Sequence, residues 1–378
     1  MPTKLNQLAD LGQSVWLDYI NRDIIESGKL KAWIEEGLRG MTSNPSIFNQ
    51  VISQGGDYDG AIRRLKEEGK STFEIYDALT IRDIQDAADL FRPVYEKTEG
   101  LDGYVSLEIN PQMADDTQAS IDEGRRLFKE VARPNVMIKV PATEAGFPVV
   151  EELLASGINV NVTLIFSVDQ YCRTVRSYCE GLTRLSRTTP DLRQVRSVAS
   201  VFVSRVDSVV DKLIDEKVSA KPQDALKAEL LALKGTAAVA NCRVILECYQ
   251  ELFARAPFKA LAAQNAQIQR VLWGSTSTKN PLYNDVKYVE ELITPLSVNT
   301  IPEKTLKAFL DHGEVKTALT DPAESAEAVL KALDRFGIKV NDVCQDLLDD
   351  GVAAFQKAFE ELLQSIEAKA QQLCESTQ

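Results

Sequence analysis

The amino-acid sequence predicts an α/β fold in which eight strands and the helices between them close into a (β/α)8 barrel, the TIM barrel, with additional helices that include a C-terminal one. Two observations lead to this prediction. Eight strand-like runs are separated by helix-like segments along 378 residues, and such alternation indicates a parallel sheet. No Gly-x-Gly-x-x-Gly turn follows the first strand, which disfavours an open, doubly wound sheet.

Short runs rich in apolar and β-branched residues predict the strands. They lie at residues 14–20, 40–46, 104–111, 136–143, 158–166, 195–205, 270–281 and 297–302. The second run is expected to pass into a loop, because Pro45 disfavours helix at Asn44. The seventh passes into a loop of small residues.

Apolar residues three and four positions apart predict the helices. These cover residues 3–13, 22–37, 57–69, 72–97, 115–130, 144–156, 168–187, 207–217 and 222–255. Ser71 or Thr72 is expected to cap the helix over 72–97. A closing amphipathic helix is predicted from Val352, Phe355, Phe359, Leu362 and Ile366. We expect residues 1–378 to form a single domain, with the barrel at about 14–310 and a C-terminal helical extension at about 322–378.

The composition excludes several classes of partner. A formal net charge of -13 and a pI of about 4.8 argue against nucleic acid or an anionic membrane as a partner. No apolar run is long enough to span a bilayer, and the first residues lack the apolar core of a signal peptide. The six cysteines form no Cys-x-x-Cys pair and are expected to be reduced thiols. We therefore expect a cytoplasmic protein, either a monomer or a homodimer.

A single histidine, His312, limits the possible chemistry. It cannot supply a histidine-rich zinc site, and no Gly-x-Ser-x-Gly motif accompanies it to form a catalytic triad. Any catalysis is therefore expected to use lysine, carboxylate, hydroxyl and amide groups, without a metal or another cofactor.

Lys139 lies in the middle of the strand predicted at 136–143, between apolar neighbours. Met137 and Lys139 share one face of this strand, and Val136, Ile138 and Val140 share the other. Lysine is rarely buried without a purpose, and a buried amine loses its proton more readily and so becomes a nucleophile toward a carbonyl group. The alternative for this segment alone is a salt-bridged or snorkelling lysine at a strand end.

Neighbouring strands carry polar residues in strict alternation with apolar ones, which is unusual for parallel barrel strands. The polar positions are Ser106, Glu108 and Asn110 in one strand and Asn159, Asn161 and Thr163 in another. Since the apolar set must face the covering helices, the polar set is expected to point into the barrel and meet Lys139 near the carboxyl ends of the strands. The alternative is a polar layer that only satisfies its own hydrogen bonds.

The chemistry of these residue types suggests roles. Lys139 is expected to attack a ketone and give an imine that acts as an electron sink. Glu108 is the expected acid/base group for imine formation, through a water held by Thr163, and Asp18 is suited to moving a proton on a substrate hydroxyl during carbon–carbon cleavage. Asn44, Asn161 and Ser200 are suited to binding a polyol. Arg205 and Lys279 are candidates for binding a phosphate.

The ordered motifs resemble the transaldolase family of class I Schiff-base enzymes. They occur between residues 14 and 280 and are the Asp18 strand, Thr42-Ser-Asn44-Pro45-Ser46, Val105-Ser-Leu-Glu108, Ile138-Lys139-Val-Pro-Ala-Thr143, Gly157-Ile-Asn-Val-Asn161-Val-Thr163-Leu, Ser200-Val-Phe202-Val-Ser-Arg205 and Gly274-Ser-Thr-Ser277.

The resemblance implies a barrel with the imine lysine, Lys139, on the fourth strand. It implies transfer of a dihydroxyacetone unit from a ketose phosphate, sedoheptulose 7-phosphate or fructose 6-phosphate, to glyceraldehyde 3-phosphate or erythrose 4-phosphate in the pentose phosphate pathway. It implies that the acid/base groups are Asp18, Glu108 and Thr163. It implies that the donor hydroxyls are bound by Asn44, Asn161 and Ser200 and the phosphate by Arg205, with Ser277 included among the substrate-binding residues. Many family members have an arginine at the second phosphate-binding position, where this chain has Lys279. The phenylalanine at position 202 is similar to the transferases of the family, since related fructose 6-phosphate aldolases tend to carry tyrosine at this position.

Two other functions remain open at this stage. One is a Schiff-base fructose 6-phosphate aldolase, which cleaves without transferring. The other is a barrel without catalysis that binds sugar phosphates.

Overall fold

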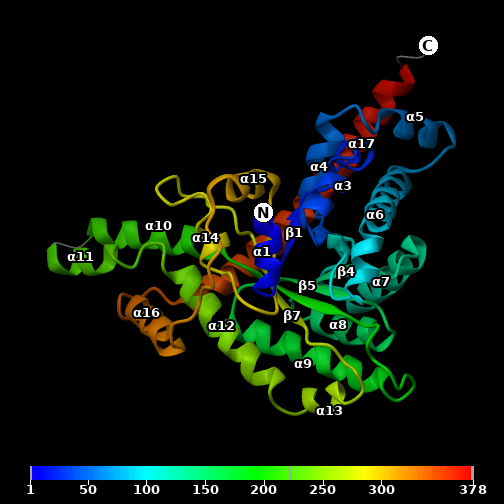
Figure 1. Ribbon diagram of the computed structural model, residues 1–378. Coiled ribbons are helices and arrows are strands. Elements are labelled where there is room, and N and C mark those ends of the chain that lie inside the picture. Colours follow the sequence, from blue (N-terminus) through cyan, green and yellow to red (C-terminus); the bar gives the residue numbers. More distant parts are fainter. Residues whose placement is uncertain (1, 221–223, 376–378) are drawn as a thin grey trace.

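Eight parallel strands close into a barrel in sequence order in the computed structural model, which describes residues 2–220 and 224–375. Strand β8 pairs with β1, with Ser297 beside Gln13, and this pairing closes the sheet (Figure 1). The TIM barrel predicted from the sequence is therefore confirmed. The strands are β1 (Gln13–Asp18), β2 (Gly40–Thr42), β3 (Tyr104–Glu108), β4 (Val136–Pro141), β5 (Val160–Ile165), β6 (Ser197–Phe202), β7 (Arg270–Gly274) and β8 (Ser297–Ile301).

Helices surround this barrel and extend beyond it (Figure 1). They are α1 (Lys4–Asp10), α2 (Arg22–Glu26), α3 (Lys29–Glu36), α4 (Pro45–Gln54), α5 (Asp59–Glu67), α6 (Thr72–Lys97), α7 (Thr117–Val131), α8 (Gly146–Ala155), α9 (Val168–Leu185), α10 (Ser204–Ala220), α11 (Asp224–Leu231), α12 (Ala237–Phe253), α13 (Phe258–Ala262), α14 (Lys287–Glu290), α15 (Glu303–His312), α16 (Ala323–Arg335) and α17 (Val340–Glu375), with a 3-10 turn η1 (Pro111–Met113). None of the helices in the described ranges is both long and apolar enough to cross a membrane.

The structure corrects four of the predicted segments. The segment 22–37 is two helices, because Gly28 between them takes a left-handed conformation with φ of 83°. The segment 222–255 is also divided, into α11 and α12; residues 222 and 223 lie outside the described residues. Pro45 begins helix α4 instead of a loop, because Asn44 caps the helix from outside and proline is favoured at the first helical position. Arg205 lies in the first turn of α10 and not at the end of a strand.

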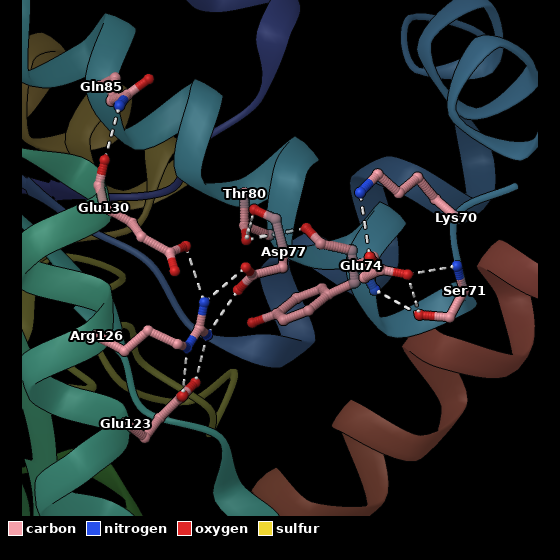
Figure 2. Close-up of polar contacts among 10 residues, drawn as sticks. Lys70, Ser71, Glu74, Asp77, Thr80, Gln85, Glu123, Arg126 and Glu130 are labelled. Carbon is pink, nitrogen blue, oxygen red and sulfur yellow. Dashed lines mark hydrogen bonds and ion pairs between the residues drawn. The ribbon is translucent and has the colours of Figure 1, made fainter. Parts of the chain in front are cut away.

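The start of α6 follows the capping prediction. Ser71 accepts a hydrogen bond from the backbone N–H of Glu74, and the Glu74 carboxylate accepts one from the backbone of Ser71. Figure 2 shows this reciprocal pair, with Lys70 donating to the same glutamate. Such a capping box satisfies two N–H groups that would otherwise lack partners.

Arg126 joins helix α6 to α7 through ion pairs. The guanidinium of Arg126 donates to the carboxylates of Asp77, Glu123 and Glu130 at 2.7–2.9 Å (Figure 2). Asp77 comes from α6, whereas the two glutamates come from α7 itself, one turn to either side of the arginine. The network therefore fixes the two covering helices beside each other.

The interior of the barrel has its own apolar core, separate from the core between the strands and the helices. Its buried members all point inward, and they are Trp16, Tyr104, Met137, Val198, Leu272 and Val298. Met137 thus lies on the inward face of β4, while Ile138 and Val140 belong to the outer core. Because side chains alternate along a strand, Lys139 shares the inward face with Met137.

Helix α17 is the long C-terminal helix, which crosses the structure beside α4 and α10 (Figure 1). It also packs against α5, α6, η1 and β5. The contact with β5 is close: a Cβ on Gly351 would lie 3.0 Å from a methyl carbon of Leu164. Leu164 has a left-handed φ of 59°, at a shift of register between β5 and β6. This irregular strand end and the glycine together let α17 approach the barrel.

Candidate active site

A cavity of about 170 Å³ opens at the carboxyl ends of the barrel strands. Except for Glu108, the side chains predicted to form a site all line it: Asp18, Asn44, Lys139, Asn161, Thr163, Ser200, Phe202, Arg205, Ser277 and Lys279. They come from β1, β4, β5, β6, the start of α10 and the loops after β2 and β7. Parallel strands place all their carboxyl ends at one edge, which is why residues 260 positions apart in the chain meet there.

Lys139 is buried, with 4% of its surface exposed. Its ammonium nitrogen Nζ donates to the backbone carbonyl of Ser43 at 3.0 Å and lies 3.6 Å from Oε2 of Glu108. Glu108 is directly beside Lys139 in the register of β3 and β4. The hydroxyl of Ser43 in turn donates to the backbone carbonyl of Ser106, which holds the end of β2 against β3. The amine thus has a neutral carbonyl at hydrogen-bond distance and its carboxylate slightly farther away.

Glu108 is buried beside Lys139 but borders a small separate hollow under Phe355. Burial raises the pKa of its carboxyl group to about 7, since the attraction of Lys139 only partly offsets the loss of solvation. Oε2 of Glu108 and Oγ1 of Thr163 are buried without a hydrogen-bond partner among the described residues. Buried polar atoms are normally paired, so both atoms are suited to binding a water or a substrate hydroxyl.

Asp18 ends β1 at the cavity surface. Burial raises the pKa of its carboxyl group. Four groups oppose this effect and lower the pKa, namely Lys139, the Thr42 hydroxyl, Lys279 and Arg205. Thr42 donates to Oδ1 of Asp18 at 2.7 Å. The carboxylate therefore has a fixed orientation and three cations in its surroundings.

The neutral polar residues form a short chain across three strands. Ser200 donates to Oδ1 of Asn161 at 2.6 Å, and Nδ2 of Asn161 donates to the hydroxyl of Ser106 at 3.0 Å. Asn44 uses its side-chain oxygen to accept from the backbone N–H of Ile47 at the start of α4. These bonds fix the amide groups in position at the cavity wall.

Arg205 and Lys279 are the two further cations that line the cavity. The guanidinium of Arg205 stacks over the ring of Phe202, 5.6 Å from its centroid, and has no carboxylate at ion-pair distance within the described ranges. Lys279 donates to the hydroxyl of Ser277 at 2.7 Å. Burial lowers the pKa of both groups, and Arg205 lowers that of Lys279 further. Two neighbouring cations without a bonded carboxylate favour an anionic ligand.

Of the six alternating polar residues, only Asn161 and Thr163 line this cavity, and two of the others, Asn110 and Asn159, bond to backbone groups next to their strands. Asn110 lies beyond the end of β3 and accepts a hydrogen bond from the backbone of Gln112 in the 3-10 turn. Asn159 precedes β5 and donates to the backbone carbonyls of Pro134 and Val136. The expectation that both point inward toward Lys139 is wrong, because the strands are shorter than their sequence patterns.

The cavity wall contains residues that sequence reasoning did not select. They include Thr42, Ser46, Ser275, Thr300, Pro302 and Phe355. Thr42 belongs to the Thr-Ser-Asn-Pro-Ser motif, and its position at a strand end was a usable signal. Phe355 comes from α17, and only the packing of that helix brings it to the cavity. Within the described residues no group of histidine, cysteine, aspartate and glutamate is arranged to hold a metal ion.

A model of the transaldolase/fructose-6-phosphate aldolase family matches residues 15–366. The chain belongs to this family. The resemblance read from the motifs is thereby confirmed.

Similar proteins of this family cover nearly the whole chain. The chain is 44% identical to a transaldolase of Trichodesmium erythraeum (strain IMS101) over 372 residues, which are 98% of both chains. It is 44% identical to transaldolase 2 of Nostoc sp. (strain PCC 7120) over 373 residues, again 98% of both. It is 43% identical to a transaldolase of Thermobifida fusca (strain YX) over 379 residues, 100% of both. The family match therefore includes the strands, the cavity and helix α17.

Proposed function

We propose that this member of the transaldolase/fructose-6-phosphate aldolase family is a transaldolase. It transfers a dihydroxyacetone unit from a ketose phosphate, fructose 6-phosphate or sedoheptulose 7-phosphate, to an aldose phosphate, erythrose 4-phosphate or glyceraldehyde 3-phosphate. The observation that carries the proposal is the amine of Lys139, which is buried in a polar cavity between Glu108 and a neutral carbonyl. The names of the full-length relatives support the same activity.

The first half of the reaction forms the imine and breaks the donor. Lys139 first gives one ammonium proton to the Glu108 carboxylate, and its uncharged amine adds to the ketone carbon of the donor. Glu108 returns the proton to the hydroxyl of the carbinolamine, which leaves as water and gives a protonated imine. A carboxyl group with a pKa of about 7, that of Glu108, can both donate and accept the protons of these steps near neutral pH, with Thr163 holding the water. Asp18 takes the proton from the C4 hydroxyl, the C3–C4 bond breaks into the imine, and the first aldose leaves.

The second half reverses these steps with a new acceptor. The enamine on Lys139 attacks the aldehyde carbon of the incoming aldose phosphate, and Asp18 returns its proton to the new hydroxyl. Water then hydrolyses the imine, with Glu108 again transferring the protons, and the product ketose leaves. No metal or other cofactor is needed, because the imine itself accepts the electrons of the broken bond.

The remaining cavity residues have binding roles in this proposal. Asn44, Asn161 and Ser200 bind the hydroxyls of the donor, and their fixed orientation supports this assignment. Arg205, Lys279 and Ser277 bind the phosphate, since Lys279 bonds the Ser277 hydroxyl and neither cation has a bonded carboxylate among the described residues. Phe202 supports the guanidinium of Arg205.

Borohydride trapping with fructose 6-phosphate tests the proposal. The protein is treated with both reagents, digested and mapped by mass spectrometry, with Lys139→Ala as the control. We expect a dihydroxyacetone-sized adduct on Lys139 that disappears when erythrose 4-phosphate is added before the reduction. A folded protein that gives no adduct on Lys139 would falsify the Schiff-base mechanism and favour a sugar-phosphate-binding barrel.

A fructose 6-phosphate aldolase is the second candidate, because the matching family includes both activities. Product analysis separates the two. An aldolase releases free dihydroxyacetone in the absence of an acceptor, whereas a transaldolase holds the unit on Lys139 until an aldose phosphate arrives.

The setting of this activity is also a proposal. We place the reaction in the pentose phosphate pathway, in the cytoplasm, because its substrates are sugar phosphates of that pathway. We also propose that the chain is one domain, since α17 packs against α4, α5, α6 and β5 from different parts of the barrel.

A further inference from the structure

Asp18 is the end of a chain of hydroxyl groups that crosses three adjacent strands. Oγ1 of Thr42 lies 2.7 Å from Oδ1 of Asp18 and also 2.7 Å from Oγ1 of Thr300. Thr42 ends β2 directly beside Asp18, and Thr300 lies on β8, on the other side of β1. Both threonines are buried at the cavity wall, with 2% and 5% of their surfaces exposed.

The number of protons fixes the direction of this chain. Each hydroxyl has one proton, and an ionised carboxylate can only accept. When Asp18 is ionised, Thr42 must therefore donate to Asp18, and Thr300 must donate to Thr42. When Asp18 is protonated on Oδ1, rotation of the two hydroxyls lets Asp18 donate to Thr42 and Thr42 donate to Thr300. The same three groups can thus pair Asp18 in both protonation states.

We propose that Thr42 and Thr300 are positioning residues that let Asp18 first accept and later return a proton. This inference rests on the proposed function, in which Asp18 ionises and protonates once in each transfer. The chain fixes the rotamer of the carboxylate toward the cavity and gives a bonded partner to either charge state. It acts through Asp18 and takes no proton from the substrate itself.

Other groups around Asp18 do not replace this chain. Three cations favour the ionised form of Asp18: Lys139 from β4, Arg205 from α10 and Lys279 from the loop after β7. The carboxylates of Asp18 and Glu108, the latter from β3, each oppose the ionisation of the other. None of these four forms a hydrogen bond with Asp18 within the described residues, whereas Thr42 does. The threonine hydroxyl is therefore the contact that sets the orientation of the carboxylate.

The test compares Thr42→Val and Thr300→Val, which remove only the hydroxyl, with Thr42→Ser and Thr300→Ser, which retain it. Thr80→Val is the matched control, because Thr80 is equally buried but donates to the backbone of Tyr76 in α6, away from the cavity. Three properties are measured: kcat and KM, the pH dependence of kcat, and the mass of the borohydride adduct on Lys139.

We expect Thr42→Val to lower kcat about tenfold to a hundredfold with a much smaller change in KM. General acid–base catalysis contributes about 10²–10⁴-fold, and this variant disturbs the orientation of Asp18 but keeps its carboxyl group. The bond to the ionised carboxylate is charge-assisted and stronger than the bond to the neutral form, so loss of the hydroxyl should move the acidic limb of the pH profile to higher pH. Thr300→Val should act in the same direction with a smaller effect. Both serine variants should retain activity within a few fold of the parent.

The mass of the borohydride adduct on Lys139 distinguishes a failure of this inference from a failure of the proposed function. Imine formation precedes the step that needs Asp18, so Thr42→Val should trap the whole six-carbon ketose phosphate on Lys139, where the parent traps the three-carbon unit. An unchanged three-carbon adduct with a parent-like pH profile in both valine variants would overturn the positioning role while leaving the Schiff-base mechanism intact. A rise in KM alone would show that Thr42 is only a substrate ligand. The absence of any adduct in the parent would instead overturn the proposed function.

A second inference concerns two cysteines on the outside of the barrel. Cys172 of α9 and Cys248 of α12 lie with their sulfur atoms 2.7 Å apart, and both side chains are half-buried. The other cysteines have no sulfur partner in the described residues. Thiols this close need little movement to reach the S–S bond length of about 2.05 Å.

The geometry points to an intramolecular disulfide between Cys172 and Cys248, formed by exchange with a small disulfide such as oxidised glutathione. The thiolate of Cys172 attacks one sulfur of the reagent and releases one thiol. The thiolate of Cys248 then attacks Cys172 of this mixed disulfide and releases the second thiol. Two protein thiols are oxidised and one reagent disulfide is reduced to two thiols, so electrons and protons balance.

Peptide mapping under non-reducing conditions tests this site after treatment of the full chain with oxidised glutathione. We expect one peptide pair joined through Cys172 and Cys248, an intact mass lower by two hydrogen atoms, and no such pair in Cys248→Ser. Cys179→Ser is the control, because Cys179 is buried on the same helix and should leave the link unchanged. A stable glutathione adduct on Cys172, or two free thiols after treatment, would overturn the inference.

Discussion

Two clusters of buried charges, one at each end of the barrel interior, differ in how completely their members are hydrogen-bonded. At the amino end of the strands, Arg270 donates to Asp102, to Ser14 and to the backbone carbonyl of Leu101 at 2.6–2.9 Å. Ser14 also donates to the second oxygen of Asp102 at 2.8 Å, so every group in this cluster bonds another member.

At the carboxyl end, the bonding of the buried charges is incomplete. The ammonium of Lys139 is 3.6 Å from Glu108, and Oε2 of that glutamate has no hydrogen-bond partner among the described residues, nor does the hydroxyl of Thr163. A saturated buried cluster stabilises the fold, because it leaves no polar atom unpaired. An unsaturated one retains groups that can bond a ligand, and this difference separates the Arg270–Asp102 cluster from the candidate active site.

The largest expected effect is on catalysis. Lys139→Ala should lower activity roughly a thousandfold or more, because it removes the nucleophile that forms the imine in the proposed mechanism. The fold should remain, since the pKa of the neighbouring Glu108 is already raised to about 7 and its carboxyl group can be neutral when the lysine is absent. A coupled transaldolase assay measures the activity and near-ultraviolet circular dichroism the fold. Full turnover in the folded variant would contradict the proposed role of the lysine.

A change in the Arg270 cluster, at the amino end of the strands, should lower stability instead of activity. Arg270→Ala leaves Asp102 as an uncompensated buried carboxylate and should lower the free energy of unfolding by about 3–5 kcal/mol. Urea denaturation measures this loss, and the activity per folded molecule should be unchanged. Arg133→Ala is the control, because its ion pair with Asp89 is largely exposed and should contribute less than about 1 kcal/mol.

The pH dependence of stability tests the unsaturated end. The folded pKa of Glu108, about 7, is above its ordinary value of 4.5, so the folded protein binds this proton more tightly than the unfolded chain. Its contribution to stability is complete below pH 4.5 and is lost as the pH rises through 7. Relative to Glu108→Gln, which cannot titrate, the parent should therefore lose about 3 kcal/mol of unfolding free energy over that range.

Urea denaturation of both proteins at intervals from pH 4.5 to 8 measures this difference. Titrating groups that both proteins share cancel in the comparison. A difference that stayed constant with pH would mean that Glu108 ionises in the folded protein as it does in the unfolded chain.

A smaller effect is expected at the cationic side of the cavity. Lys279→Ala should weaken the binding of phosphorylated substrates about tenfold to a hundredfold, the usual effect of losing a charged hydrogen bond. Unphosphorylated analogues should bind almost unchanged, and Lys331→Ala, a change of an exposed lysine on α16, is the control. KM values for each substrate pair measure the effect. Equal losses for both kinds of substrate would remove Lys279 from the phosphate site.

The smallest effect is expected at the surface network of α6 and α7. Arg126 has three carboxylate partners but remains partly exposed, so Arg126→Ala should cost only about 1 kcal/mol of unfolding free energy. Repeating the urea denaturation in high salt should reduce this difference, because salt screens exposed charges. A loss as large as that of Arg270→Ala would show that saturation of the bonds matters more than burial.

Much of the fold and of the site could be predicted from the sequence because the barrel is regular. Alternation of strand and helix gives a parallel sheet, and the closed barrel puts every strand's carboxyl end at one edge. Lys139, Asp18 and Thr163 could therefore be assigned to one place without a structure. Strand and helix boundaries were less predictable: Arg205 belongs to a helix and Asn110 to a turn, because backbone hydrogen bonding ended the strands earlier than the polar pattern did.

The sequence by itself determined the architecture, the family motifs and part of the set of side chains at the barrel mouth, since these depend on periodicity and residue type. Only the tertiary structure decided which of those side chains touch. The pairing of Thr42 with both Asp18 and Thr300, and the arrival of Phe355 from α17, join segments far apart in the chain. Such contacts depend on strand register and helix packing to within an ångström, and no local pattern of residues encodes that distance.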